Sequence, residues 1–208
     1  MKRKILSLFL CSVVLMGTVS GCGTDKSTTN TSSTVSETEY KTIKPPKEGW
    51  TIESLVNTMT FFGKELSFPI TLEQLGDDFS IDTTSAVVDT EVNSIITQLK
   101  YNDEFVCMIS YSGHTSIDEI DRNTSIDFLS LNKNEKFGDY FSVNSVSFGT
   151  KSDEIVNLLG SPTDGADKAD GQDISWEYKI DSEKNYGLFV GMTSEENVGS
   201  FLVFLGSE

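Results

Sequence analysis

Apolar and polar residues alternate strictly through the stretch Asp173-Ile174-Ser175-Trp176-Glu177-Tyr178-Lys179-Ile180. Successive side chains of a β-strand point to opposite faces, so this period of two predicts an antiparallel strand with one buried and one solvated face. Two further apolar runs follow, at residues 186–192 and 198–205. We therefore predict a three-stranded antiparallel meander over this region, with Trp176 on its buried face.

The segment before the meander predicts a helix. Residues 150–154 combine hydroxyl groups with two acidic side chains, which suit the first turn and the positive end of the helix dipole. The apolar residues at 155, 158 and 159 share one face. Gly160 and Pro162 then end the helix.

The preceding residues give a similar order of elements. A short helix is expected over 51–59, and residues 59–68 predict a hairpin around Gly63-Lys64. Residues 71–76 have the form of a capping box followed by a glycine stop. Residues 92–111 predict a second hairpin around Asn102-Asp103, and 126–131 predict a further strand.

Together these elements predict an α+β fold made of two tandem units. Each unit would pack a helix on an antiparallel sheet of three to four strands, with units at 46–135 and 136–208. The pairs Ser67-Phe68…Leu75-Gly76 and Ser147-Phe148…Leu159-Gly160 occupy corresponding places, as in a weak internal repeat. About 160 residues are enough for a core without disulfides.

The N-terminus carries a targeting signal. A basic start at residues 2–4 precedes an apolar run at 5–16 that is too short to span a bilayer. The segment closes with Val19-Ser20-Gly21-Cys22, which resembles the lipobox of bacterial lipoproteins. This resemblance implies a signal peptide at 1–21 and lipid on Cys22, which would anchor the chain on the outer side of a cell membrane. The alternative is a plain signal peptide with an incidental cysteine.

Residues 22–45 predict a flexible tether, because ten of the fifteen residues from Thr24 to Thr38 are Ser or Thr. Trp50 marks the expected start of packed structure. The formal net charge is −16, and the basic residues at 2–4 contribute +3, so the chain after the signal carries −19. This charge argues against nucleic acid and against docking on anionic lipid, and it permits a cationic partner.

Few residues offer catalytic chemistry. His114 is the single histidine, and Cys107 lies in an apolar run that predicts a buried strand. No nucleophile elbow or glycine-rich phosphate loop occurs, so we predict no cofactor and no enzyme. Asp164, Asp167, Asp170 and Asp173 recur every third residue, a weak calcium candidate that lacks the spacing of an EF-hand loop. A solvated loop is the simpler interpretation of these four acids.

The second predicted unit resembles two known families. Gly149-Thr150, the helix end Leu159-Gly160-Ser161-Pro162 and the strand Trp176-x-Tyr178 are similar to the barrel-assembly lipoproteins of the SmpA/OmlA (BamE) type and to the repeats of the β-lactamase inhibitor protein. The inhibitor resemblance implies a sheet that can be presented to a protein partner. The chain as a whole is similar to uncharacterised lipoproteins of Gram-positive bacteria.

The sequence therefore favours a membrane-anchored, extracytoplasmic module that binds a protein or a ligand without catalysis. The alternative is a cell-envelope hydrolase with a carboxylate-based site. The shape of the folded part discriminates between kinds of partner. A pocket with converging polar groups favours a small ligand, and an open sheet face with exposed aromatic residues favours a protein.

Overall fold

The computed structural model describes residues 42–163, 175–181, 186–193, 195 and 197–205. They belong to a compact unit that spans residues 38–208. The predicted signal peptide, Cys22 and nearly all of the predicted tether lie outside the described residues. Asp164, Asp167, Asp170 and Asp173 also lie outside them.

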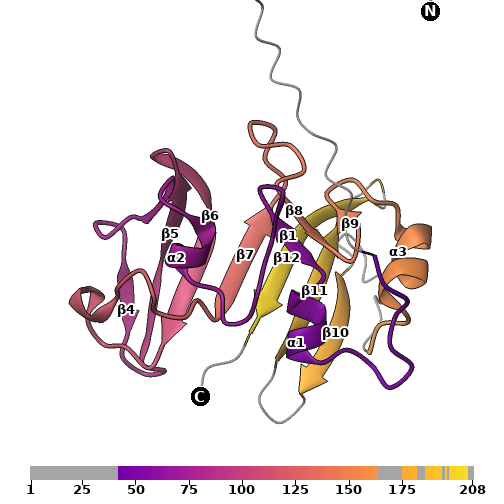
Figure 1. The fold of residues 1–208 in the computed structure, drawn as a ribbon, viewed down its shortest axis with the longest axis horizontal. Coiled ribbons are helices and arrows are strands. Elements are labelled where there is room, and N and C mark those ends of the chain that lie inside the picture. The colour runs from indigo at the N-terminus through magenta and orange to yellow at the C-terminus, as the bar shows by residue number, and fades with distance from the viewer. Residues whose placement is uncertain (1–41, 164–174, 182–185, 194, 196, 206–208) are drawn as a thin grey trace, which may run out of the picture. The chain divides into compact units, whose positions relative to one another are not determined.

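The larger of two antiparallel sheets contains eight strands (Figure 1). Its order is β10-β11-β12-β7-β6-β5-β3, and the short β4 also pairs with β5. Strand β7 pairs with β12 from Asn132↔Ser200 to Phe128↔Phe204, which places the C-terminal meander and the central hairpin in one sheet. The strands are β3 (Phe79–Ile81), β4 (Val87–Asp89), β5 (Ser94–Tyr101), β6 (Glu104–Ser112), β7 (Phe128–Asn132), β10 (Ser175–Asp181), β11 (Tyr186–Met192) and β12 (Val198–Phe204).

A smaller sheet of four strands packs on one face of the larger one. Its order is β2-β1-β8-β9, formed by β1 (Met59–Phe61), β2 (Lys64–Glu65), β8 (Phe141–Val143) and β9 (Val146–Ser147). All side chains of β1 and β8 are buried. The ring of Phe141 meets the ring of Phe201 on β12 edge to face, with centroids 5.0 Å apart. The hydrophobic core lies between the two sheets.

The described helices are short. They are α1 (Ile52–Val56), α2 (Leu72–Leu75), α3 (Ser152–Leu159) and a single 3₁₀ turn, η1 (Ile117–Glu119). At α2 the Thr71 hydroxyl accepts a hydrogen bond from the Gln74 amide, and the Gln74 side chain accepts one from the Thr71 amide. Gly76 ends α2 with φ +106° and Gly160 ends α3 with φ +83°, conformations that glycine adopts without strain.

The predicted fold of two tandem helix-on-sheet units is wrong, because the chain is mainly β. The sheet formed by residues 94–132 continues through β12 into the predicted second unit. Strand β1 pairs with β8, with Met59 opposite Val143 and Phe61 opposite Phe141, so the small sheet combines residues from both predicted units. The helices cover too little area to form a layer of their own, and the small sheet covers the core instead.

Several local predictions are confirmed. The hairpin around Asn102-Asp103 is β5 and β6, and the meander is β10, β11 and β12. The predicted helix before the meander is α3. Tyr178 is buried as expected, and Trp176 is partly buried against the core.

The described chain contacts the domain from Thr42 onward, where the Thr42 and Ser145 hydroxyls form a hydrogen bond. The Ile43 amide donates to Asn144 Oδ1 at 2.7 Å, and Asn144 Nδ2 donates to the Ile43 carbonyl at 2.9 Å. Asn144 Nδ2 also donates to the Leu158 carbonyl. Trp50 is buried, and its indole N–H donates to the Leu159 carbonyl at 2.8 Å. The buried Asn144 therefore fixes the point where the preceding segment joins the folded part.

Candidate functional site

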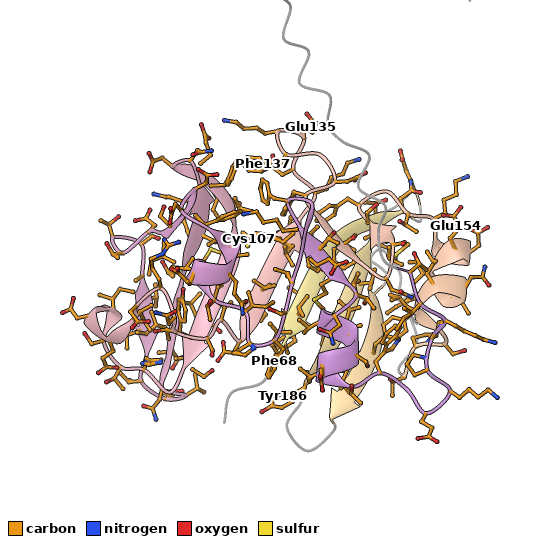
Figure 2. All side chains as sticks on the ribbon, in the orientation of Figure 1. Phe68, Cys107, Glu135, Phe137, Glu154 and Tyr186 are labelled. Carbon is orange, nitrogen blue, oxygen red and sulfur yellow. The ribbon has the colours of Figure 1, made fainter. Side chains whose placement is uncertain are left out.

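A pocket of about 650 Å³ opens between three loops of the described structure. We call it the Phe68 pocket, after the side chain on the loop that joins β2 to α2 (Figure 2). Its volume lies in the range of small-molecule sites, and its lining mixes apolar and polar groups as such sites do. The lining residues are Phe68 and Pro69, then Ser112 at the end of β6 and His114 after it, then Asp121 and residues 123–127 before β7.

Arg122 holds two walls of the pocket together. The Ile126 amide donates to the Ile70 carbonyl at 2.8 Å, and the Glu73 amide donates to the Arg122 carbonyl at 2.9 Å. The Arg122 guanidinium donates to three backbone carbonyls of the α2 region, at distances between 2.9 and 3.2 Å, those of Leu72, Gly76 and Phe79. The three carbonyls belong to the start of α2, to the residue that ends it and to the first residue of β3, so one side chain connects consecutive elements. The loop at 121–127 and the chain at 70–79 therefore form one braced unit.

Asp127 forms the buried floor of the pocket. Only 8% of the residue is exposed. Its Oδ1 accepts a hydrogen bond from the Ser110 hydroxyl at 2.6 Å, and its Oδ2 accepts one from the Ser112 amide at 2.7 Å. Both donors are neutral, and no Lys, Arg or His nitrogen of the described residues lies within 4.0 Å of the carboxylate. Buried carboxylates are normally paired with a cation, whereas the described residues hold this one with two neutral donors.

The charge of Asp127 acts on its surroundings. The pKa of the Tyr111 hydroxyl is raised, first because the phenol is buried and second because the Asp127 carboxylate opposes a second negative charge. The Tyr111 hydroxyl has no hydrogen-bond partner among the described residues. The negative charge of Asp127 therefore reaches beyond its two hydrogen bonds.

Asp121 supplies a second carboxylate at the rim. Its Oδ1 accepts hydrogen bonds from the Asn123 amide at 2.8 Å and from the Thr124 hydroxyl at 3.1 Å, which form a tight turn. Its Oδ2 receives no hydrogen bond from the part of the chain that the structure describes. Asp121 is exposed, so this oxygen can accept a hydrogen bond from a ligand.

His114 lies in the pocket wall and contacts Glu119. Its Nδ1 is 3.5 Å from Glu119 Oε2, and the pKa of Glu119 is lowered, mainly by the hydrogen bond from the Thr115 amide. The hydroxyl that contacts the Asp127 carboxylate belongs to Ser110, and no hydrogen bond among the described residues joins His114 to a serine. A Ser-His-Asp triad is therefore not assembled here.

Phe68 is the feature that separates this pocket from other apolar surfaces. It is 45% exposed and lines the same pocket as several polar residues. A strip of Phe128, Phe189 and Phe204 lies on the face of the large sheet opposite the core, with neighbouring ring centroids 5.0 and 5.7 Å apart. Each ring of that strip is only partly exposed, because it is covered by its neighbours. A pocket with polar groups, which favours a small ligand, is therefore present, whereas the aromatic residues on the open sheet face are too little exposed to favour a protein partner.

The other residues singled out in the sequence have different positions. Cys107 is a free, buried thiol on β6, and burial raises its pKa, which suits a structural hydrophobe. In the described part of the chain, no three His, Cys, Asp or Glu side chains are grouped as a metal site. The weak calcium candidates, Asp164, Asp167, Asp170 and Asp173, and the lipid site, Cys22, remain predictions because they lie outside the described residues.

Comparison with known proteins does not extend these observations. The chain matches no protein-family model, no curated protein and no solved structure. Within the described residues, no helix has the length and apolar character needed to cross a membrane.

Proposed function

We propose that this chain is an extracytoplasmic lipoprotein of a Gram-positive bacterium that binds a small ligand in the Phe68 pocket without catalysis. The lipid on Cys22 holds it at the outer face of the cell membrane, and residues 22–45 serve as the tether. The observation that carries the binding role is the half-exposed Phe68 facing the hydrogen-bonding groups of the 121–127 loop. An aromatic wall with a few placed polar groups is the usual composition of a ligand site.

A cell-envelope hydrolase is the alternative, and the pocket does contain two carboxylates. General acid–base catalysis needs a carboxyl group that can exchange a proton with the substrate. Both oxygens of Asp127 already accept hydrogen bonds from the protein, which suits a structural anion. Of the two carboxylates, only Asp121 has an oxygen that accepts no hydrogen bond from the described residues, and glycoside hydrolysis normally uses a pair of carboxyl groups.

The anchor is tested by metabolic labelling with a fatty-acid analogue. The wild type should be labelled and should sediment with membranes, and Cys22→Ala should lose both properties. Cys11→Ala is the matched control, because Cys11 lies within the predicted signal peptide and should be dispensable for labelling. Label that persists in Cys22→Ala would contradict the lipid site.

The binding role is tested by NMR titration of the full chain in a nonionic detergent with neutral sugars, amino acids and small amines. A ligand should shift the amides of residues 112–114 and 121–127 in a saturable way. Phe68→Ala should weaken binding about threefold to tenfold, since it removes one aromatic contact. The matched control is Phe105→Ala, because Phe105 is similarly exposed at 47% and does not line the pocket.

Two results would contradict the binding role. One is the absence of any saturable shift at the pocket, and the other is an equal loss of affinity in Phe68→Ala and Phe105→Ala. Turnover of a glycoside, ester, peptide or peptidoglycan substrate that disappears in Asp121→Asn would favour the hydrolase instead.

A further inference from the structure

We propose that the Phe68 pocket selects a small organic cation, in which an ammonium, amidinium or guanidinium group is joined to an apolar part. This inference rests on the proposed binding role and adds the chemical class of the ligand. It follows from three features of the lining, namely two carboxylates, the absence of a fixed positive charge and an exposed aromatic ring.

The charge of the lining excludes anions. Asp121 and Asp127 are both acidic, and none of the described residues that line the pocket is Lys or Arg. The neighbouring Arg122 directs its guanidinium to the carbonyls of Leu72, Gly76 and Phe79, so it is not available to the ligand. His114 is the one lining side chain that can carry a positive charge, and its Nδ1 lies 3.5 Å from Glu119 Oε2, so a phosphate or carboxylate would meet like charge without a dedicated cationic partner.

The buried Asp127 favours a cation over a neutral ligand. Its two hydrogen-bond donors are neutral groups, and a neutral ligand would displace water without adding a compensating charge. A cation adds that charge in a partly enclosed space, where electrostatic attraction is stronger than in open water. At the rim, the free Oδ2 of Asp121 can accept a charge-assisted hydrogen bond from the same group.

Phe68 accounts for the apolar part of the ligand. The face of an aromatic ring carries partial negative charge that attracts a cation, and the ring also packs against apolar groups, so one ring can contact both parts of the ligand. Pro69 extends this apolar wall. The net charge of −19 on the chain after the predicted signal, which follows from −16 for the whole sequence less +3 at residues 2–4, would also raise the rate at which a cation reaches the pocket.

The test uses three probes of nearly the same shape and different charge, which are benzamidinium, benzamide and benzoate. Each is titrated into the full chain, and the amides of residues 112–114 and 121–127 are followed by NMR. Benzamidinium should bind at least fivefold more tightly than benzamide, and benzoate should bind more weakly than either. Added sodium chloride should lower the affinity for benzamidinium severalfold and leave the affinity for benzamide unchanged, because salt screens only the charged probe.

Two isosteric variants locate the effect. Asp121→Asn keeps the Oδ1 acceptor of the turn and removes the charge. It should lower the affinity for benzamidinium about threefold to tenfold and reduce the ratio of that affinity to the affinity for benzamide. Asp103→Asn removes the same charge from the turn at the opposite end of β6, where φ is +65°, a conformation that Asn also tolerates. Asp103→Asn should leave all three affinities unchanged.

The outcomes separate the two proposals. If benzamide or a neutral sugar saturates the pocket as tightly as benzamidinium, the cation preference is wrong and the binding role stands. If Asp103→Asn weakens benzamidinium as much as Asp121→Asn does, the preference belongs to the acidic surface as a whole and the inference is wrong. If no probe and no sugar shifts these amides, both proposals fail.

Discussion

Replacement of Arg122 should loosen the whole wall of the pocket. Its side chain is 38% exposed, yet it donates to three backbone carbonyls and pairs with Glu73 Oε2 at 3.1 Å. A hydrogen bond from a charged donor contributes roughly 1.5–3 kcal/mol, and partial exposure places each of these bonds at or below the lower end. Because such bonds are not additive, we expect Arg122→Met to cost about 2–4 kcal/mol.

The assay is thermal and urea unfolding of the full chain, with Tm expected to fall by roughly 5–15 °C for a domain of this size. Hydrogen exchange gives a local readout. The amides of Glu73 and Ile126, which bridge the two segments, should exchange faster in the variant while those of β11 and β12 stay protected.

Two control variants separate geometry from charge. Glu73→Gln removes only a surface ion pair and should cost less than about 1 kcal/mol. Arg122→Lys keeps the charge but cannot reach three carbonyls at once, so it should recover only part of the lost stability. Full stability in Arg122→Lys, or a loss below about 1 kcal/mol in Arg122→Met, would refute the bracing role.

Three further predictions concern the rest of the domain. The hydrogen bond from the Lys100 ammonium holds the pKa of Asp82 well below its usual range, so this carboxylate stabilises the fold above about pH 4 and the contribution is lost as the pH falls further. Asp82→Asn should therefore make the loss of stability below about pH 4 less steep, and an unchanged acid-unfolding profile would contradict this. Iodoacetamide should leave Cys107 unmodified until the domain unfolds, and mass spectrometry that finds the adduct in the folded protein would refute its burial. Trp50→Phe should cost about 1–2 kcal/mol in urea unfolding through the lost bond to the Leu159 carbonyl, and no loss would mean that the N-terminal segment packs without it.

Local sequence signals predicted the local elements well. Asn102 and Asp103 both have positive φ, at 49° and 65°, as expected of these residue types in a tight hairpin turn. The box at Thr71 and the glycine stop at Gly76 likewise depend on residues within a few positions of each other. These turns and caps depend only on residues close together in the sequence, so they can be predicted without knowing which distant segments pack against them.

The architecture depended on partners that are far apart in the sequence. Strands β1 (Met-Thr-Phe) and β8 (Phe-Ser-Val) have only three residues each, so their patterns are too short to indicate which distant strand each one pairs with. Their pairing joins residues 59–61 to residues 141–143. The sequence therefore predicted two separate units where the structure interleaves them in shared sheets.

The candidate site was missed for a related reason. Phe68 and Phe148 occupy corresponding places in the weak internal repeat, and the sequence pattern predicts Phe68 as the end of a hairpin. The structure buries Phe148 against Tyr140 and Phe201 and leaves Phe68 exposed. The serine, asparagine and aspartate residues of 121–127 offered the only local signal, because a polar loop next to a strand is a frequent location of binding groups.

The positions of the anchor and of the pocket bear on how the proposed lipoprotein would work. Asn144 and Leu159 hold the N-terminal segment at Ile43 and Trp50, and none of these four residues lines the pocket. A ligand can therefore bind without displacing the contacts that join the tether to the domain. The tether then sets how far the pocket can reach from the membrane, and the lining of the pocket sets the affinity. On this reasoning, changes in tether length should alter access to ligands near the cell surface and leave the intrinsic affinity of the pocket unchanged.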